Sequence, residues 1–135
     1  VRGDGDLTTI KRSHQDFKGV KTAGAFDLYV TQGTTYEVKI EAEENLLNYI
    51  VTEVNDNVLV VKVKKGINLR PRKDIKLFVT APVFRELSIA GSGGVWLYAS
   101  QSLDVHISGG GDVYYKGNPV NIKKHIAGSG NLVAQ

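Results

Sequence analysis

Large aromatic side chains recur at one position of a short glycine-rich repeat, and they are the residues of this sequence best suited to bind a ligand. Tyr29, Trp96 and Tyr114 each stand five residues after the first glycine of a repeat copy, and Tyr98 lies farther along the same strand face as Trp96. Exposed rings on a flat sheet can stack on sugars or anchor a protein partner. The alternative is cross-strand pairing of the rings, which stabilises a sheet without any ligand. We assign these four aromatics as the candidate ligand-binding residues.

Two histidines occupy equivalent repeat positions and could ligate a metal. His106 and His125 each precede the first glycine of a copy by three residues, so stacked copies would place them about 5 Å apart. Asp104 is near enough in sequence to join them as a ligand. The competing interpretation is an outward polar column on a solvated sheet, and Lys123 and Lys124 beside His125 would repel a cation. We favour the polar column and predict neither a metal site nor a cofactor.

The other reactive residue types form no catalytic arrangement. The chain has no cysteine, which excludes thiol catalysis and cysteine-ligated zinc. Glycosidases need two carboxylates that face one groove, and Asp104 and Asp112 are the only acids after Glu86. A strand pattern follows each glycine-rich segment, whereas phosphate-binding loops lead into a helix. We predict no catalytic residues and a protein that is not an enzyme.

Five similar segments organise the elements that must position these residues. The segments share the pattern Gly-x-Gly followed by a turn-forming and an apolar residue, with Phe26 in place of the second glycine in one copy, and they begin at Gly3, Gly24, Gly91, Gly109 and Gly128. The near-constant spacing of the last three copies indicates a stacked repeat architecture. One copy cannot bury its apolar side alone, but stacked copies can.

Apolar residues form columns when the copies are aligned on their first glycine. Isoleucines stand two positions before it in the last three copies, at Ile89, Ile107 and Ile126. Apolar residues stand four positions after it in every copy, at Leu7, Leu28, Val95, Val113 and Leu132. The strand period of two should point both columns into one core. Asp, Asn or Gly three positions after the first glycine, as at Asp27, should mark a corner.

The first half of the chain reads as longer strands with one helical turn near residues 43–48. Alternating patterns predict strands over 26–32, 36–42, 50–54, 58–63 and 75–80. The first two should join at Gly33, and Asn55–Asn57 is a strong turn signal. We predict an all-β fold, a right-handed β-helix or β-solenoid-like stack in a short form, with Gly-Ser-Gly repeat turns.

Length and composition place the chain among small globular proteins. A chain of 135 residues with 41% hydrophobic residues forms one domain, residues 1–135. The formal net charge of +3 is mildly basic, and the densest basic stretch, residues 62–76, lacks the interleaved aromatics of a nucleic-acid interface. We interpret that stretch as lysines that protect a strand edge. No apolar run reaches the roughly 18 residues of a membrane span, and a chain that starts at Val1 suggests a removed targeting segment.

Several segments together resemble one family. They are Asp16–Gly33, Glu41–Leu47, Val79–Pro82, the repeated Gly-Ser-Gly units, and the closing stretches Lys116–Val120 and Ala127–Gly130. In this order they are similar to the DUF2807 family, the putative auto-transporter adhesin "head GIN" domain. The resemblance implies a β-helix-like fold and export to the envelope or surface, often in Bacteroidetes. Members usually carry more Gly-Ser-Gly coils, so the chain resembles a short form.

The functional hypothesis is a non-enzymatic, exported binding or adhesin-like module of the cell envelope. Its expected partner is a glycan or a surface protein, with no nucleic acid, no membrane span in this chain, and possible homo-oligomers. The expected location is periplasmic, outer-membrane-associated or at the cell surface. A degenerate carbohydrate-active enzyme and a purely structural spacer remain the alternatives.

Overall fold

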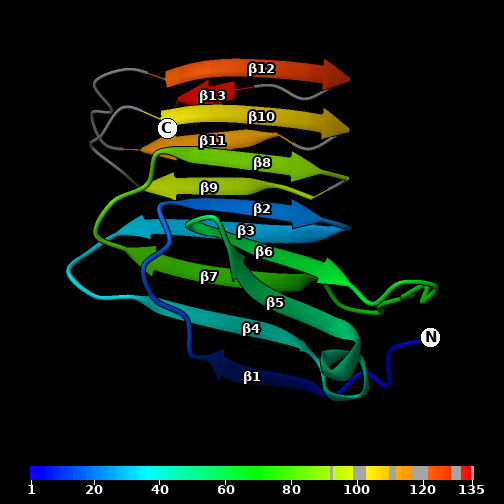
Figure 1. The fold of residues 1–135 in the computed structure, drawn as a ribbon. Coiled ribbons are helices and arrows are strands. Elements are labelled where there is room, and N and C mark those ends of the chain that lie inside the picture. Colours follow the sequence, from blue (N-terminus) through cyan, green and yellow to red (C-terminus); the bar gives the residue numbers. More distant parts are fainter. Residues whose placement is uncertain (92, 99–102, 110–111, 117–121, 129–131, 135) are drawn as a thin grey trace.

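Two β-sheets enclose one apolar core in the computed structural model, which describes residues 1–91, 93–98, 103–109, 112–116, 122–128 and 132–134 (Figure 1). Within these residues the seven-stranded sheet has the order β1 (Leu7–Arg12), β4 (Glu37–Glu43), β7 (Ile75–Ala81), β3 (Phe26–Gln32), β9 (Val95–Tyr98), β11 (Val113–Lys116) and β13 (Leu132–Ala134). The six-stranded sheet has the order β12 (Ile122–Gly128), β10 (Leu103–Gly109), β8 (Glu86–Ala90), β2 (Gly19–Ala23), β6 (Val58–Val63) and β5 (Ile50–Asn55). A short 3₁₀ helix, η1 (Glu44–Tyr49), joins β4 to β5. The all-β prediction is confirmed, and both sheets contain parallel and antiparallel pairs.

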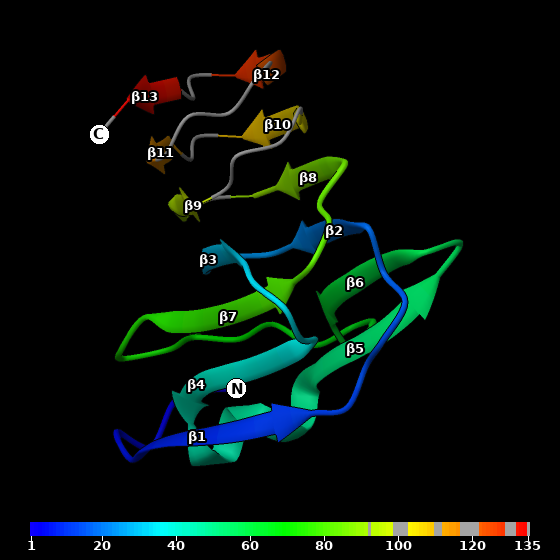
Figure 2. The ribbon, with the colours of Figure 1, turned by 90° about the vertical axis from the view of Figure 1, so that its left-hand side faces the viewer.

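Consecutive strands in the second half of the chain alternate between the two sheets and stack as coils (Figure 2). Each coil pairs in parallel with the next, β8 with β10 and β10 with β12 in one sheet, and β9 with β11 and β11 with β13 in the other. The predicted apolar columns are in register, and they are Ile89–Ile107–Ile126 and Val95–Val113–Leu132. The first two side chains of each column are buried in the same core. The prediction of stacked, in-register columns is therefore confirmed; the side chains of Ile126 and Leu132 lie outside the described ones.

Glycine is required where one coil turns against the next. Gly93 has a φ of 113°, and a Cβ added there would lie 2.1 Å from the carbonyl oxygen of Phe26 in the neighbouring coil. The predicted corner differs at Asp27, which lies within β3, whereas Asp6, Gly94 and Asp112 directly precede their strands. The Asp27 carboxylate accepts a hydrogen bond from the Gly94 N–H at 3.0 Å. The left-handed residues of these turns are thus glycines, while Asp27 bridges adjacent coils. Gly111 and Gly130, the equivalent glycines of the last two copies, lie outside the described residues.

The order of coils in space differs from their order in the chain. The β2–β3 coil lies between β6–β7 on one side and β8–β9 on the other, with parallel pairing on both sides. The chain therefore passes from β7 to β8 across an earlier coil, whereas a simple solenoid adds each coil next to the previous one. β6–β7 also lacks a Gly-x-Gly turn, because residues 64–74 connect its strands. The connection of β3 to β4 begins at Gly33, as predicted, but the two strands are separated in the sheet by β7.

The first repeat copy is not a coil of the stack. β1 is antiparallel to β4, and Leu7 is 42% exposed although its column was expected to point inward. Thr8 is half-buried on the inner side instead. A shift of one residue moves every side chain of a strand to the other face, which explains the wrong assignment of Leu7.

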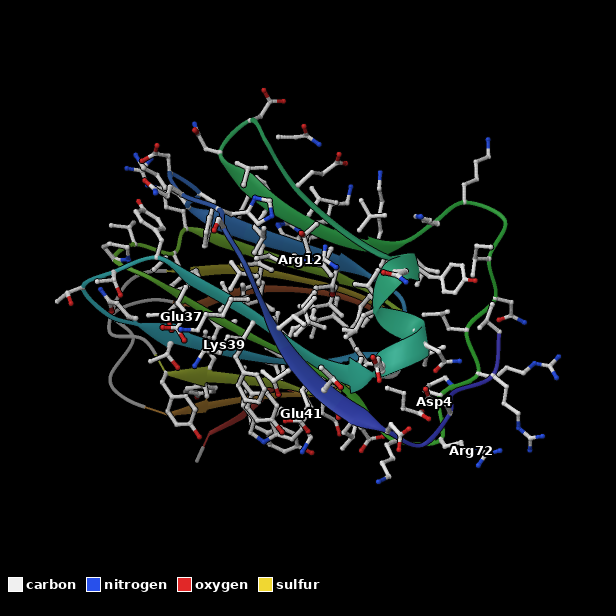
Figure 3. All side chains as sticks on the ribbon, turned by 90° about the horizontal axis from the view of Figure 1, so that it is seen from below. Asp4, Arg12, Glu37, Lys39, Glu41 and Arg72 are labelled. Carbon is white, nitrogen blue, oxygen red and sulfur yellow. The ribbon has the colours of Figure 1, made fainter. Side chains whose placement is uncertain are left out.

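The lower end of the molecule is closed by polar side chains that join the two sheets (Figure 3). From β1, the Arg12 guanidinium donates to the Thr52 hydroxyl at 3.2 Å and to the carbonyl oxygens of Leu47 and Ile50 at 3.3 and 3.2 Å.

The β5–β6 turn has Asp56 and Asn57 at φ of 50° and 65°, which is the conformation of a tight hairpin. The prediction of a turn at Asn55–Asn57 is therefore confirmed.

One buried carboxylate ties three separate segments together. Glu43, at the end of β4, has no exposed surface. It accepts hydrogen bonds from the backbone N–H groups of Gly5, Arg72 and Lys73, at 2.5, 2.5 and 3.1 Å. Burial favours the neutral acid, but the three N–H donors and the nearby Arg72 charge together hold the pKa of Glu43 below its ordinary value. The N-terminal residues and the loop before β7 are therefore fixed to β4 by an ionised group.

We expect Gly93→Ala to destabilise the fold more than Gly66→Ala. Both glycines have positive φ, 113° and 82°, so both changes carry the cost of a left-handed alanine, about 1 kcal/mol. Only at Gly93 does the new Cβ meet backbone, since nothing lies within 4 Å of a Cβ at Gly66. The difference in the free energy of unfolding, measured in urea, should exceed about 1 kcal/mol. Equal losses would contradict the close approach of the coils.

The stability contribution of Glu43 should be lost in acid. A carboxyl whose folded pKa is lowered stabilises the fold above its unfolded pKa, and this contribution disappears as the pH falls through the folded pKa. We expect Glu43→Gln to be less stable than the parent at neutral pH and to lose less stability on acidification. Glu53→Gln is the control, because Glu53 is an exposed partner of Lys62 at 3.1 Å. A Glu43→Gln unfolding profile parallel to that of the parent between neutral and strongly acidic pH would contradict this role.

Candidate binding face

Four aromatic rings form a continuous stack across the outer face of the seven-stranded sheet. Phe78, Tyr29, Trp96 and Tyr114 occupy paired positions on β7, β3, β9 and β11. Successive ring centroids are 5.0, 4.7 and 5.4 Å apart, and successive ring planes differ by 14°, 10° and 21°. We call these four residues the aromatic ladder.

Strand alternation places the aromatic ladder on the outside. Each ring stands next to a buried residue of its own strand, such as Leu28 in β3 and Val95 in β9, and all four ladder residues are partly exposed. The prediction that Trp96 and Tyr114 point outward as neighbours is confirmed. The pairing of β3 with β9 also stacks Tyr29 directly on Trp96.

Sequence reasoning missed Phe78. The strand pattern of residues 75–80 was recognised, but no repeat glycine precedes that strand, so its register with the coils could not be read. The pairing Tyr29–Phe78 follows from the insertion of β2–β3 beside β7, which is a tertiary feature. The alternation within β7 did indicate that Phe78 points away from buried Leu77 and Val79.

The stacking geometry determines which parts of the rings a ligand can touch. Nearly parallel rings with centroids near 5 Å must overlap, because rings lying side by side in one plane would collide at that separation. The rings therefore stand up from the sheet, each partly covering the next. Trp96 also leans over Gly94, where a Cβ would come within 2.7 Å of the indole. The face presents ring edges along its length, and the neighbouring strands place Lys39 opposite Phe78 at one end and Val133 opposite Tyr114 at the other.

Polar and aromatic groups flank the aromatic ladder. Tyr98, the fourth candidate, is 44% exposed and pairs with Thr31 one step further along the strands. At the Phe78 end lies an open hollow of about 380 Å³, whose lining includes Thr31, Glu37 and Lys39. Glu37 and Lys39 form an ion pair at 2.7 Å, and the hydrogen bond and charge of Lys39 lower the pKa of Glu37. Figure 3 shows both side chains along β4, together with Glu41. Asp27 and Asp112 each lie two residues before a ladder tyrosine, Tyr29 and Tyr114, near the start of the same strand.

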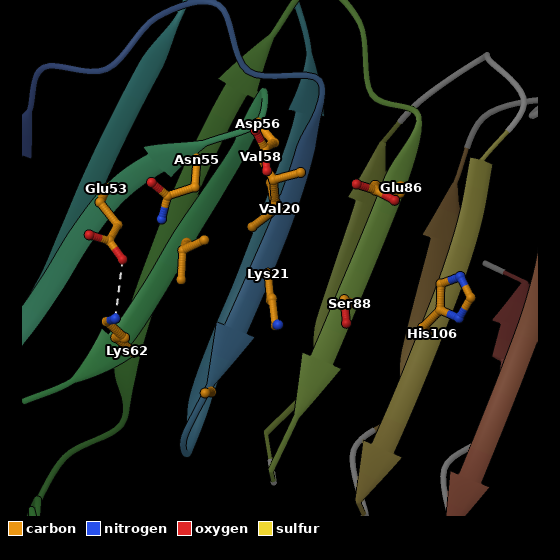
Figure 4. A pocket seen from close by; sticks show the side chains of 12 residues that line it. Val20, Lys21, Glu53, Asn55, Asp56, Val58, Lys62, Glu86, Ser88 and His106 are labelled. Carbon is orange, nitrogen blue, oxygen red and sulfur yellow. Dashed lines mark ion pairs between the residues drawn. The ribbon is translucent and has the colours of Figure 1, made fainter. Parts of the chain in front are cut away.

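The outer face of the six-stranded sheet carries the predicted histidine column. His106 is exposed and in register with Ser88, Lys21 and His125 along β8, β2 and β12. His106 and the β5–β6 hairpin line an open hollow of about 680 Å³, in which Glu53 and Lys62 are paired at 3.1 Å (Figure 4). The side chains of Asp104 and His125 lie outside the described ones. Among the described residues, no three His, Cys, Asp or Glu side chains are grouped to hold a metal.

The described helical segment is too short and polar to cross a membrane, so no membrane-spanning helix is found in the described part of the chain.

Known proteins resemble the chain in sequence profile and in fold. The DUF2807 profile, described as "putative auto-transporter adhesin, head GIN domain", matches residues 16–95 and 85–119. A comparison with curated proteins finds no match. A solved putative adhesin from Parabacteroides distasonis ATCC 8503 is similar with a TM-score of 0.72 at 22% identity, covering 100% of this chain and 67% of its own.

Two further solved structures share the fold over their full lengths. A putative adhesin from Bacteroides fragilis NCTC 9343 has a TM-score of 0.61 at 15% identity, with 100% of both chains covered. A putative lipid binding protein from Parabacteroides distasonis ATCC 8503 has a TM-score of 0.58 at 19% identity, covering 100% of this chain and 99% of that one. At these identities the structural likeness concerns the fold alone. Because the family profile covers most of the sequence, the chain belongs to the DUF2807 family of head GIN domains.

Proposed function

We propose that the chain is a non-enzymatic binding module of the cell envelope, exported to the periplasm, the outer membrane or the cell surface. The family description and the names of two solved neighbours both refer to adhesion. We further propose that residues 1–135 act as one domain, in which a solenoid-like stack of coils provides a rigid platform. The observation that carries the functional proposal is the partly exposed aromatic ladder on an otherwise flat sheet.

The aromatic ladder stabilises the sheet, but stability alone does not require it. Cross-strand aromatic pairs contribute roughly 0.2–1 kcal/mol each, a range that β-branched pairs on a solvated face also reach. Large partly exposed aromatics are instead enriched at surfaces that bind partners. Tyr98, which is 44% exposed beside the ladder, adds a ring that lies outside the stack. We therefore assign Tyr29, Trp96, Tyr114, Tyr98 and Phe78 to the binding face.

The geometry favours an oxygen-rich ligand such as a glycan. Ring edges carry a partial positive charge, so they attract the hydroxyl and carbonyl oxygens of a sugar. The neighbouring carboxylates of Asp27 and Asp112 can accept hydrogen bonds from sugar hydroxyls. A surface protein that docks on the same ridge, and a second copy of the chain, are the alternative partners.

Other functional classes make different demands on this surface. A degenerate carbohydrate-active enzyme would require two acids converging on a substrate groove, and the ladder face is a ridge flanked by separate acids. A structural spacer would require the rings only for stability. Ligand affinity of a variant that lacks ladder rings distinguishes the spacer from the binding module, because only a binding module would lose affinity.

Removal of two ladder rings should weaken binding while the fold persists. We expect Trp96→Thr combined with Tyr114→Thr to reduce affinity for a glycan identified by array screening about tenfold or more, since each ring contributes about 1 kcal/mol. Threonine keeps a strand-forming side chain at both positions, and the loss in unfolding free energy should stay below about 2 kcal/mol.

The control is Tyr49→Ala, which removes a partly exposed aromatic from η1, away from the ladder. Glycan affinity and sedimentation velocity should both be measured for the three proteins. Unchanged binding and unchanged association in the folded double variant would assign the ladder to stability alone. Loss of self-association without loss of glycan binding would instead identify a second copy as the partner.

A further inference from the structure

Two chain segments that are distant in sequence form a basic corner at one end of the molecule. Arg2 and Arg70 form a parallel β-bridge: the Arg70 N–H donates to the Val1 carbonyl at 2.7 Å, and the Gly3 N–H donates to the Arg70 carbonyl at 3.0 Å. Figure 3 shows Arg72 and Asp4 at this end, away from Glu37 and Lys39. The basic stretch was interpreted as the protected edge of a strand, but Arg70 and Arg72 lie in the loop between β6 and β7.

The bridge places like charges side by side. Residues paired across a bridge point to the same face with their Cβ atoms about 5 Å apart, and like charges in such a pair repel each other. Arg72 joins them around one open hollow of about 650 Å³, lined by Val1, Arg2, Asn68, Arg70, Pro71 and Arg72. No acidic residue lines the hollow, and all three arginines are exposed. We call Arg2, Arg70 and Arg72 the arginine corner.

Internal carboxylates do not neutralise this charge by direct pairing. Glu43 accepts its hydrogen bonds from backbone N–H groups, including that of Arg72, and not from a guanidinium. The Asp4 carboxylate accepts from the Asp6 N–H at 2.9 Å. The ion pairs found among the described residues, Glu37–Lys39 and Glu53–Lys62, lie elsewhere.

The backbone that carries the arginine corner is held firmly. The Asn45 side chain donates to the Arg2 carbonyl at 2.7 Å and accepts from the Asp4 N–H at 3.0 Å. Glu43 fixes Gly5 on one side and Arg72 on the other. The three guanidinium groups are therefore attached to a preorganised base, which lowers the entropy cost of binding an anion between them.

We propose that the arginine corner binds a phosphate group. The planar fork of arginine matches phosphate oxygens bidentately, and a phosphate monoester carries up to two negative charges against the three positive ones. A single carboxylate would leave two of the arginines uncompensated. The group belongs either to the headgroup of an anionic lipid or to a soluble phosphate ester, and this site is separate from the aromatic ladder.

Inorganic phosphate tests the site directly. We expect the parent chain to bind it in calorimetric titrations at low ionic strength, and Arg70→Gln combined with Arg72→Gln to weaken binding at least about tenfold. The variant should fold, because it loses only the Arg72 charge near Glu43 and keeps all three backbone N–H groups that hydrogen-bond to that carboxylate. Arg70→Lys with Arg72→Lys keeps the charge but loses the forks, so its affinity should fall between the two.

The matched control is Lys18→Gln combined with Lys21→Gln, which removes the same charge from exposed positions beside and within β2. Its phosphate affinity should change less than about twofold. Vesicles of phosphatidylcholine with and without phosphatidic acid distinguish a lipid headgroup from a soluble ester. Binding only to the vesicles that contain phosphatidic acid, lost in the Arg70 and Arg72 variants, assigns a lipid headgroup. Binding of inorganic phosphate without binding of vesicles assigns a soluble ester. The proposal is overturned if the parent binds neither probe. It is also overturned if the Arg70→Gln/Arg72→Gln variant and the Lys18→Gln/Lys21→Gln control lose phosphate affinity equally. Urea unfolding of every variant verifies the fold.

Discussion

The contact on which most of this structure depends is the approach of one backbone turn to the next where no side chain separates them. At Gly93 a Cβ would overlap the Phe26 carbonyl, and at Gly91 it would lie 2.5 Å from the Gly24 carbonyl. Because these turns nest, β2–β3 and β8–β9 pair in parallel on both sheets at once. The same nesting allows the Asp27 carboxylate to reach the Gly94 N–H of the adjacent coil. The tight turns and the in-register pairing of the sheets therefore depend on each other.

In-register stacking turns a repeated sequence position into a row of like side chains. On the inside, the rows are apolar and close-packed, as at Ile89 and Ile107. On the outside, the same rule aligns rings into the aromatic ladder. It also aligns His106 with His125. A face built in this way repeats one chemical group at the strand spacing of about 5 Å, which suits ligands that are themselves extended and repetitive.

The sequence was informative where contacts follow a short period and uninformative where they do not. The coils from β8 onward repeat one motif, so the register of Trp96 with Tyr114 could be derived from glycine positions alone. Phe78 could not be placed, because β7 enters the stack beside β3 without a repeat turn. The Arg2–Arg70 bridge joins two segments that buried Glu43 holds together, and no local sequence pattern predicts this pairing. Leu7 was misplaced because β1 pairs with β4 outside the stack, and a motif copy by itself does not specify that its strand is shifted by one residue there.

The insertion of the β2–β3 coil between β6–β7 and β8–β9 has a consequence for folding. The β10–β11 and β12–β13 coils each contact the preceding coil in the chain, so they can form successively on an existing template with short loop closures. The β2–β3 coil, by contrast, acquires each of its neighbours only after a long stretch of intervening chain has been made, and such distant pairings are slow to form. We therefore expect strands β1 to β7 to form together, because their pairings depend on one another, and the remaining coils to be added to them. Amide hydrogens in β2 and β3 should accordingly exchange only on global opening, whereas those of successive outer coils exchange through smaller, stepwise openings.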